Sequence, residues 1–367
     1  MAVTGMLSMI WHQTFFKPHP LPPDVHLQGQ TAIVTGSNVG LGFEAAKELA
    51  EHGVSRLILA VRNTSKGEAA KTRILSHLKT LPSSPPCPCV IDVWPLDQES
   101  YASILAFASR AAAELERLDM VLLNAGLKLV ERRVSPDTGH ETHVQVNHLG
   151  TALLSLLLLP TLRRTTRTVR RKDGLGPARL SITASSVYGW VSPWEVQRPE
   201  AAESLLAWLD NPASFAKPEP GGGGRYSLSK LLCVMWAREL AEHISRDSNF
   251  NQGDANGEGQ GKEEVIVNVF NPGYCMSEFH RVDPAATGSL GKLVAWTAQQ
   301  GGYHLTDAVV MHPDSHGMYL SEQQIRPISK FVGSPEGKAV QRKLWNETLD
   351  IFRKECPGPH LDEFKDW

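Results

Sequence analysis

Short runs of apolar, often β-branched residues alternate along this chain with longer segments of helical periodicity. The apolar runs predict buried strands at residues 31–34, 55–62, 89–94, 119–123, 179–186 and 265–270. The segments between them carry apolar positions at helical spacing among good helix formers. Because strand and helix alternate repeatedly, we predict an α/β fold: a parallel, doubly wound sheet with right-handed crossovers and with helices on both faces.

The same periodicity places the helices. We predict helices at residues 43–50, 65–81, 98–117, 139–164 and 225–244, then near 288–300 and at 337–354, with a small strand at 330–332. The leucine-rich residues 153–159 form too short a run to span a membrane. We expect them to be buried against the sheet or against a second subunit.

One domain accounts for most of the chain. We predict it over residues 28–356, between an N-terminal extension at 1–27 and a C-terminal tail at 357–367. Within it, we expect residues 190–224 and 274–316 to form a substrate loop and a lid. Their aromatic side chains suit either a bulky, flat ligand or ordinary packing; they are Trp190, Trp194, Trp208, Phe215, Tyr274, Phe279, Trp296 and Tyr303.

Charge and cysteine content exclude several classes of function. The net charge of -2 gives no general reason to expect nucleic acid as a partner. The basic run at residues 163–172 lacks interleaved aromatic residues, so we interpret it as a solvated surface insertion. The 5 cysteines are badly spaced for disulfides or for a metal site, which favours a reduced, cytoplasmic setting without a metal.

Two segments, one apolar and one polar, lie outside the alternation of strands and helices. Residues 6–16 are apolar but lack the basic start of a signal peptide, so we expect a short helix that packs onto the domain. Peripheral contact with a membrane is the alternative for this helix. Residues 248–263 are polar and rich in glycine, which predicts a disordered segment or a mobile turn.

A glycine-rich turn follows the first strand and precedes the first helix. Its spacing is Gly-x3-Gly-x-Gly, from Gly36 to Gly42. Glycines allow a backbone to approach a pyrophosphate, and a helix N-terminus presents unpaired N–H groups to it. A plain structural turn is the alternative interpretation. The predicted cofactor-binding residues here are Gly36, Ser37, Asn38, Gly40, Leu41 and Gly42.

The ends of the next two strands bear on the choice of cofactor. An acidic residue after the second strand would hold ribose hydroxyls, whereas an arginine suits a 2′-phosphate. Arg62 occupies that position, which favours NADP(H) over NAD(H), although a solvent-facing arginine is the alternative. Asp97 follows the third strand, where it would accept a hydrogen bond from an adenine or cap the next helix.

Acid–base chemistry is indicated by Tyr226 and Lys230. These residues are four apart on a predicted helix, so their side chains share one face. A neighbouring ammonium favours tyrosinate and would lower the pKa of a phenol from roughly 10. Ser186, at the end of the fifth strand, would bond a carbonyl or alcohol oxygen, and Asn147 would support a water connected to Lys230. Each residue alone is also compatible with a structural role.

Taken together, these motifs resemble those of short-chain dehydrogenases/reductases, with the retinol-dehydrogenase-like and fungal biosynthetic members most similar. They occur in the family's order over roughly residues 28–280. The matching pieces are the Thr35–Gly42 turn, Asp97, Asn124-Ala125-Gly126, Asn147, Ser186, Tyr226-x-x-x-Lys230 and Pro272-Gly273. The resemblance implies a single Rossmann-type sheet.

The resemblance also implies a role for each matching position. Tyr226 would be the acid/base, Lys230 would lower its pKa and hold the nicotinamide ribose, and Ser186 rather than Ser185 would orient the substrate. Asn147 would anchor a proton-relay water. The resemblance also implies four further positions at the cofactor. These are Asn124 near the adenosine, Pro272 and Gly273 over the nicotinamide, and Ser277 at the carboxamide.

We therefore predict an NADP(H)-dependent oxidoreductase that reduces a ketone or aldehyde of an apolar small molecule, or oxidises the alcohol, in polyketide-type secondary metabolism. A retinoid, steroid or simple carbonyl is the alternative substrate. A member that has lost turnover and a non-redox isomerase or cyclase are the alternative activities. The long helices at 139–164 and 225–244 resemble those that pair in family dimers and tetramers, and a monomer stays open as well.

Overall fold

The computed structural model describes residues 11, 13–81, 89–170, 172–215, 224–251, 265–276 and 294–364. Its centre is an eight-stranded sheet with the order β3-β2-β1-β4-β5-β6-β7-β8. Every neighbouring pair is parallel except β7 and β8. The strands are β1 Thr31–Thr35, β2 Arg56–Val61, β3 Val90–Pro95, β4 Met120–Leu123, β5 Ala178–Thr183, β6 Val265–Phe270, β7 Tyr319–Ser321 and β8 Gln324–Arg326. The predicted doubly wound sheet is confirmed.

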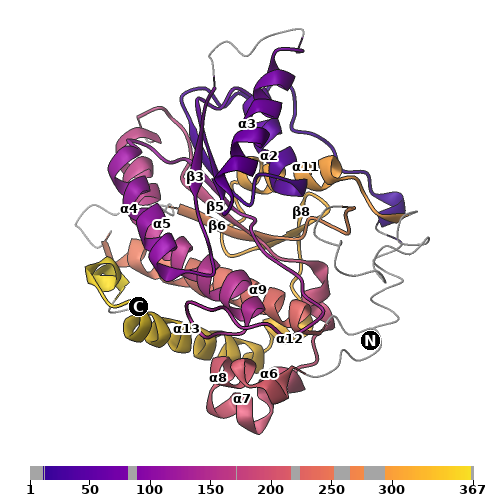
Figure 1. Ribbon diagram of the computed structural model, residues 1–367, viewed down its shortest axis with the longest axis vertical. Helices are drawn as coiled ribbons and strands as arrows, with labels where there is room; N and C mark the ends of the chain where they lie inside the picture. The colour runs from indigo at the N-terminus through magenta and orange to yellow at the C-terminus, as the bar shows by residue number, and fades with distance from the viewer. Residues whose placement is uncertain are drawn as a thin grey trace.

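Helices cover both faces of the sheet (Figure 1). On one face lie α2 Gly40–Glu51, α3 Thr64–Leu78 and α11 Ala298–Val310, and on the other α4 Tyr101–Glu114, α5 Thr151–Thr165 and α9 Gly224–Asn251. The helix α13, Pro335–Glu355, packs outside α9 and buries Trp345 against Trp236. The remaining short helices are α6 Trp194–Gln197, α7 Pro199–Glu203, α8 Leu205–Asp210, α12 Lys330–Gly333, η3 Ser186–Trp190, η4 Pro212–Ser214 and η7 Pro359–Phe364.

The leucine-rich helix begins and ends later in the chain than the predicted 139–164. A π-helical segment, η1 Val144–Gly150, leads into α5, and a second one, η2 Thr166–Arg170, continues it. By length and composition the stretch Val144–Arg170 passes for a membrane span, yet 94% of its most apolar window is buried inside this fold. Leu153 through Leu159 pack against the sheet and the helices beside it, so the expected burial occurs within the chain itself.

The basic segment at 163–172 differs from the expected solvated insertion. Arg163 and Arg170 are each only 6% exposed. Arg163 pairs with Asp247 at 2.8 Å, and Arg170 pairs at 2.9 Å with the fully buried Asp119. A buried carboxylate needs a cation, and the helix carries these arginines to that side of the fold. Arg171 lies outside the described residues.

Near the C-terminus, one predicted strand is wrong, one predicted helix is described only in part, and one hairpin was not predicted. Residues 330–333 form α12 rather than a strand, because the Ser329 side chain accepts a hydrogen bond from the Val332 N–H and caps a helical turn. Residues 288–293 of the helix expected near 288–300 lie outside the described residues. In the described part, helix α11 begins at Ala298, after a capping box made by Thr297 and Gln300. The strands β7 and β8 were not predicted, because their hairpin turn is built from Glu322 and Gln323 at positive φ.

The N-terminal segment packs onto the domain, as expected. Residues 13–15 are helical, and Gln13 is only 6% exposed. Phe16 lies against Trp296 and His304, with ring centroids 5.8 and 5.9 Å away. Residues 1–10 and most of the polar segment 248–263 lie outside the described residues.

Candidate functional site

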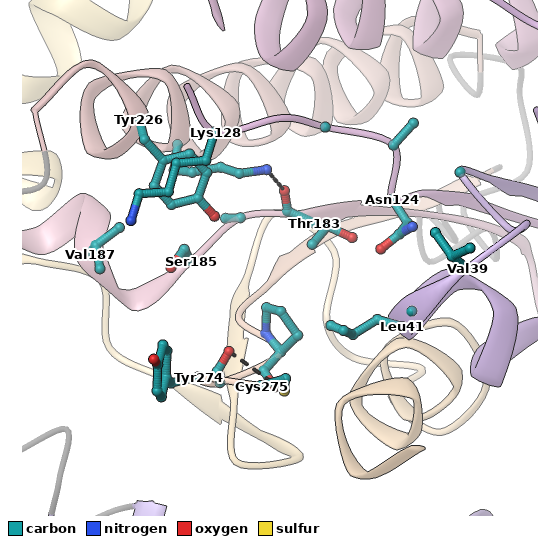
Figure 2. Close-up of a pocket in the computed structure, with 18 of the residues that line it drawn as sticks. Val39, Leu41, Asn124, Lys128, Thr183, Ser185, Val187, Tyr226, Tyr274 and Cys275 are labelled. Carbon is teal, nitrogen blue, oxygen red and sulfur yellow. Dashed lines mark hydrogen bonds between the residues drawn. The ribbon is translucent and has the colours of Figure 1, made fainter. Parts of the chain in front are cut away.

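The carboxyl ends of five parallel strands surround one cavity with a volume of about 540 Å³ (Figure 2). Ligands of doubly wound folds bind at this edge of the sheet. The structure brings most of the sequence-predicted residues to it: Gly36, Asn38, Gly40, Leu41, Arg62, Asn124, Ser186, Tyr226, Lys230, Pro272 and Gly273. Ser37, Gly42, Asp97 and Asn147 do not line it, and Ser277 lies outside the described residues.

The glycine-rich turn has the geometry of an anion cradle. Gly36 has φ of 65°, a left-handed conformation that favours glycine. Val39 precedes α2 and offers no side-chain cap, so the first N–H groups of that helix depend on another partner. Val39, Gly40 and Leu41 all line the cavity. An anion in the cavity would supply that partner and meet the positive end of the helix dipole.

Gly42, predicted to contact the cofactor, does not line the cavity and has a packing role. A Cβ atom added at Gly42 would lie 2.6 Å from both Asn124 Nδ2 and Gly36 O. The absence of a side chain therefore allows α2 to begin directly against the turn. Asn124 in turn joins two strand ends, because its N–H donates to Thr35 Oγ1 at 2.9 Å and its Nδ2 donates to Thr35 O at 3.0 Å.

Two cations line the cavity next to the end of β2. Arg62 is exposed and forms an ion pair with Glu99 at 3.1 Å, and Lys66 projects from the first turn of α3. Lys66 was not predicted as a site residue. Asp97 is turned away from the cavity, since its carboxylate accepts the Glu99 N–H at 3.0 Å and caps the turn before α4. The N-cap residue of α4 is Ser100, so Asp97 stabilises the preceding turn and does not cap the helix directly.

Tyr226 and Lys230 lie on the first turns of α9 and face the end of β5. Lys230 is 4% exposed and donates from Nζ to Thr183 O at 2.8 Å (Figure 2). The same Nζ lies 5.8 Å from the centre of the Tyr226 ring. The Tyr226 phenol forms a side-chain hydrogen bond with Ser185, and both Ser185 and the predicted Ser186 line the cavity.

The pKa of Tyr226 differs from the expected direction. Burial raises the pKa of the phenol, and the hydrogen bond with Ser185 opposes this only in part. Burial also lowers the pKa of the Lys230 ammonium. Both groups are thus shifted towards their neutral forms, because desolvation penalises each charge more than their separation of several ångströms compensates. The phenol in this state carries its proton.

Asn147 lies behind the cavity within the π-helical segment. Its Oδ1 accepts the Leu127 N–H at 2.8 Å, and its Nδ2 donates to Leu127 O and Ser229 Oγ, each at 2.9 Å. The Asn147 carbonyl accepts a hydrogen bond from Cys233 Sγ at 3.0 Å. The side chain therefore positions the segment that follows the Asn124-Ala125-Gly126 turn, and the structure places Cys233 at the carbonyl.

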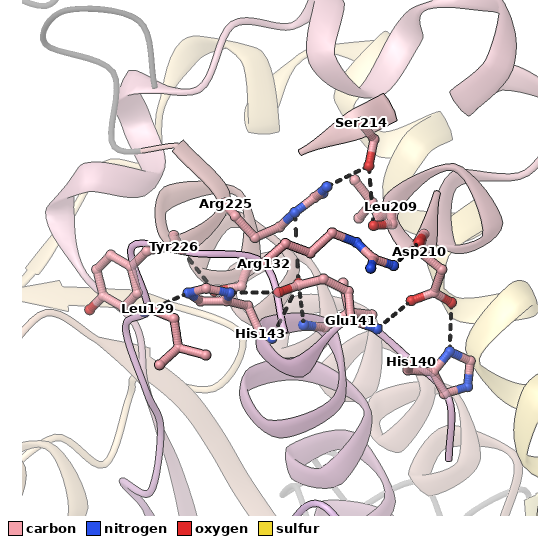
Figure 3. Close-up of polar contacts among 12 residues, drawn as sticks. Leu129, Arg132, His140, Glu141, His143, Leu209, Asp210, Ser214, Arg225 and Tyr226 are labelled. Carbon is pink, nitrogen blue, oxygen red and sulfur yellow. Dashed lines mark hydrogen bonds and ion pairs between the residues drawn. The ribbon is translucent and has the colours of Figure 1, made fainter. Parts of the chain in front are cut away.

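A buried polar network of Glu141, His143 and Arg225 lies next to Tyr226 (Figure 3). His143 Nδ1 bonds Glu141 Oε1 at 2.8 Å, and His143 Nε2 accepts the Leu129 N–H at 3.0 Å. Arg225 Nε lies 3.7 Å from Glu141 Oε2. Because Nε2 is an acceptor, Nδ1 carries the proton of this fully buried imidazole. The network fixes both Arg225, which precedes the tyrosine, and the backbone of Leu129.

Two of the predicted aromatic residues line the cavity. These are Trp190 and Tyr274. Trp208 contacts Arg198, Phe215 packs beside His143, and Trp296 stacks on His304 with ring centroids 5.1 Å apart, so packing accounts for these three. Trp194 is exposed and Tyr303 does not reach the cavity, whereas Phe279 lies outside the described residues.

Comparisons with known proteins agree with this arrangement. Residues 30–170 match the family model for short chain dehydrogenases. The short chain dehydrogenase sol3 of Alternaria solani is 46% identical over 88% of this chain and 99% of its own length. The short chain dehydrogenase virL of Hypocrea virens is 34% identical over 94% of this chain and 91% of its own length.

Solved structures share the fold at low identity. The NADP complex of RhlG from Pseudomonas aeruginosa superimposes with a TM-score of 0.55 and 20% identity, over 82% of this chain and 97% of that one. Salutaridine reductase from Papaver somniferum gives a TM-score of 0.54 and 18% identity, over 80% of this chain and 99% of that one.

Proposed function

The chain belongs to the short-chain dehydrogenase family, and on that premise we propose that it is an NADP(H)-dependent oxidoreductase of secondary metabolism. Its substrate is an apolar small molecule with a ketone or aldehyde group, or the corresponding alcohol. The observation that carries the proposal is that Tyr226, Lys230 and two serines share one cavity with the glycine-rich turn.

The residues of this cavity fit a nicotinamide dinucleotide. The uncapped start of α2 and the turn at Gly36 suit a pyrophosphate. Arg62 and Lys66 provide two cations at the end of β2, where a 2′-phosphate would lie, and this supports NADP(H) over NAD(H). Lys230 and the Pro272–Cys275 loop would hold the nicotinamide half.

The chain's own groups would manage the proton. When bound, the reduced nicotinamide supplies the hydride for the carbonyl carbon. Tyr226 holds a proton at its phenol oxygen, because burial raises its pKa, and so it can donate to a substrate oxygen in the direction of reduction. Ser185, already bonded to this phenol, or its neighbour Ser186 would orient that oxygen.

Replacing Tyr226 by Phe tests this proposal. The variant should lose turnover while its affinity for NADPH, measured by quenching of protein fluorescence, stays within about twofold, because only the hydroxyl is removed. Turnover would be followed as NADPH oxidation against a panel of aryl ketones and aldehydes. Retained turnover in this variant would refute the assigned mechanism.

The substrate itself can be sought without a panel. The wild-type enzyme and NADPH would be incubated with an extract of the source organism, and products would be identified by a mass gain of two hydrogens. A product of unchanged mass, without NADPH oxidation, would instead support an isomerase or cyclase.

A further inference from the structure

We propose that Arg133, which does not line the cavity, strengthens the binding of a 2′-phosphate by sharing the Glu99 carboxylate with Arg62. This inference rests on the proposed function, because the phosphate is that of NADP(H). It deepens that function by assigning part of the cofactor preference to Glu99 and Arg133, two residues that lie behind the cavity lining.

The Glu99 carboxylate is shared by two guanidinium groups. Arg62 Nη1 lies 3.1 Å from Glu99 Oε1, and Arg133 Nη2 bonds the same oxygen atom. The Glu99 side chain is only 10% exposed, whereas the side chains of Arg62 and Arg133 are 66% and 51% exposed. A buried carboxylate is costly without cationic partners, and among the described residues these two arginines are its partners.

Glu99 and Arg133 are each held in place by their own segment of the chain. Glu99 lies in the turn before α4, where its N–H donates to Asp97 Oδ1 at 3.0 Å. Arg133 lies in the segment between β4 and η1, where Thr142 contacts it twice. The Thr142 N–H donates to Arg133 O at 2.9 Å, and Thr142 Oγ1 lies 3.5 Å from Arg133 Nε. The shared carboxylate therefore connects the segments after β3 and β4 to the end of β2.

The charge of Glu99 makes Arg133 important for the cofactor. A 2′-phosphate bound by Arg62 would lie close to the Glu99 carboxylate, which would repel it and compete with it for the guanidinium. Arg133 offsets that negative charge, so two cations and one anion leave a net positive charge beside the phosphate. Arg62 bonds Glu99 through Nη1, and a guanidinium has five N–H donors in all, so Arg62 can bond a phosphate at the same time.

The role of Arg133 depends on the carboxylate that it shares. Without Arg133, the charge of Arg62 would be neutralised by Glu99, and the attraction of the pair for a phosphate would fall. If Glu99 is replaced by the uncharged Gln, no negative charge remains for Arg133 to offset. A general attraction between an exposed arginine and an anion would instead persist in the Glu99→Gln protein.

The test compares two nucleotides that differ only in the 2′-phosphate. Adenosine 2′,5′-bisphosphate and adenosine 5′-monophosphate would be titrated calorimetrically into each protein, and the ratio of their Kd values measures the contribution of the 2′-phosphate. Wild type should bind the bisphosphate more tightly. Arg133→Met should reduce this ratio about three- to tenfold, and Arg133→Lys should retain most of it. In the Glu99→Gln protein, adding Arg133→Met should change the ratio by less than roughly twofold.

Arg353→Met is the matched control. Arg353 is 46% exposed and pairs with Asp350 at 3.0 Å on α13, so this substitution also removes a half-exposed cation from an ion pair. Arg353 does not line the cavity. The ratio of the two Kd values should stay at the wild-type value.

Binding and turnover separate this inference from the proposed function. An unchanged ratio in Arg133→Met, or an equal loss with Glu99 and with Gln at that position, would overturn the inference. Equal affinity of wild type for the two nucleotides would refute the proposed preference for NADP(H) and the inference with it. If the ratio depends on Arg133 and Glu99 as expected but NADPH is never oxidised with any carbonyl compound, the inference stands and the proposed reductase activity fails.

Discussion

The Gln13 side chain forms hydrogen bonds with both backbone groups of Tyr274, 261 residues away in the chain. Its Oε1 accepts the Tyr274 N–H at 3.0 Å, and its Nε2 donates to Tyr274 O at 2.9 Å. The Gln13 backbone oxygen accepts the Trp296 indole N–H at 3.0 Å. The N-terminal extension is thereby attached to the loop after β6, which lines the candidate cofactor cavity.

Replacing Gln13 by Ala should therefore loosen this loop. Partly buried backbone groups of Tyr274 would lose their partners, at a cost of about 1 kcal/mol in the free energy of unfolding. We also expect the KM for NADPH to rise more than kcat falls, since the loop would contact the cofactor. Chemical denaturation and steady-state kinetics measure the two effects.

The control for Gln13 is Trp11→Ala. Trp11 is 62% exposed on the same short helical segment, so its removal should change the free energy of unfolding by no more than about 0.5 kcal/mol. Equal effects of the two substitutions would mean that the hydrogen bonds between Gln13 and Tyr274 make no specific contribution to stability.

Cofactor preference should depend on Arg62 and Lys66 together. Removing either side chain eliminates one charge-assisted contact with a 2′-phosphate, worth about 1.5–3 kcal/mol, so Arg62→Ala and Lys66→Ala should each raise the KM for NADPH roughly 10- to 100-fold. The KM for NADH should change little. Lys71→Ala is the control, because Lys71 lies on the same helix α3 but does not line the cavity. An equal rise in the KM for NADPH and in the KM for NADH would contradict this role.

The two neighbouring serines can be distinguished by substitution. In the structure Tyr226 bonds Ser185, whereas the resemblance of the sequence motifs to the family implies Ser186 as the residue that orients the substrate. If the observed bond persists during turnover, Ser185→Ala should reduce kcat about 100-fold, as loss of an oxygen-binding donor does in other enzymes, and Ser186→Ala should reduce it much less. The opposite order in a steady-state assay would assign the substrate oxygen to Ser186.

A pH effect on stability is expected from His140. Its Nδ1 lies 2.6 Å from Asp210 (Figure 3). Its Nε2 lies 3.0 Å from Glu355, so His140 connects α8 to α13. Burial opposes protonation of His140, but the hydrogen bonds and charges of the two carboxylates outweigh it and raise the pKa. This stabilisation is complete below the unfolded pKa of about 6.5 and is lost as pH rises through the folded pKa.

Thermal unfolding at several pH values checks this prediction. The Tm of wild type should decline as pH rises from about 6.5 through the folded pKa, relative to His140→Gln, which cannot titrate. The two proteins should differ most in the acidic part of this range. If the Tm of the two proteins changes with pH in parallel, the charge of His140 does not stabilise the contact between α8 and α13.

Much of the fold follows from local pattern. The β-branched runs and helical periodicities correctly predict β1 to β6 and the long helices between them, because a parallel sheet buried on both faces requires such runs. The short helices α6, α7 and α8 lie where a loop was expected. The chemistry-bearing residues follow these strands, so their common location at the carboxyl edge follows from topology. The hairpin β7–β8 and the helix α12 were missed, since their turns depend on tertiary placement of polar residues such as Ser329.

The sequence by itself determined the family, the sheet and the set of candidate residues, because motif spacing and hydrophobic periodicity are local properties. Only the tertiary structure decided which residues meet. It brought Lys66 and Lys128 into the cavity, turned Asp97 away, bonded Ser185 to Tyr226 and buried Arg170 against Asp119. The physical reason is that side-chain partners and desolvation depend on packing between segments far apart in the chain, and no local pattern records that packing.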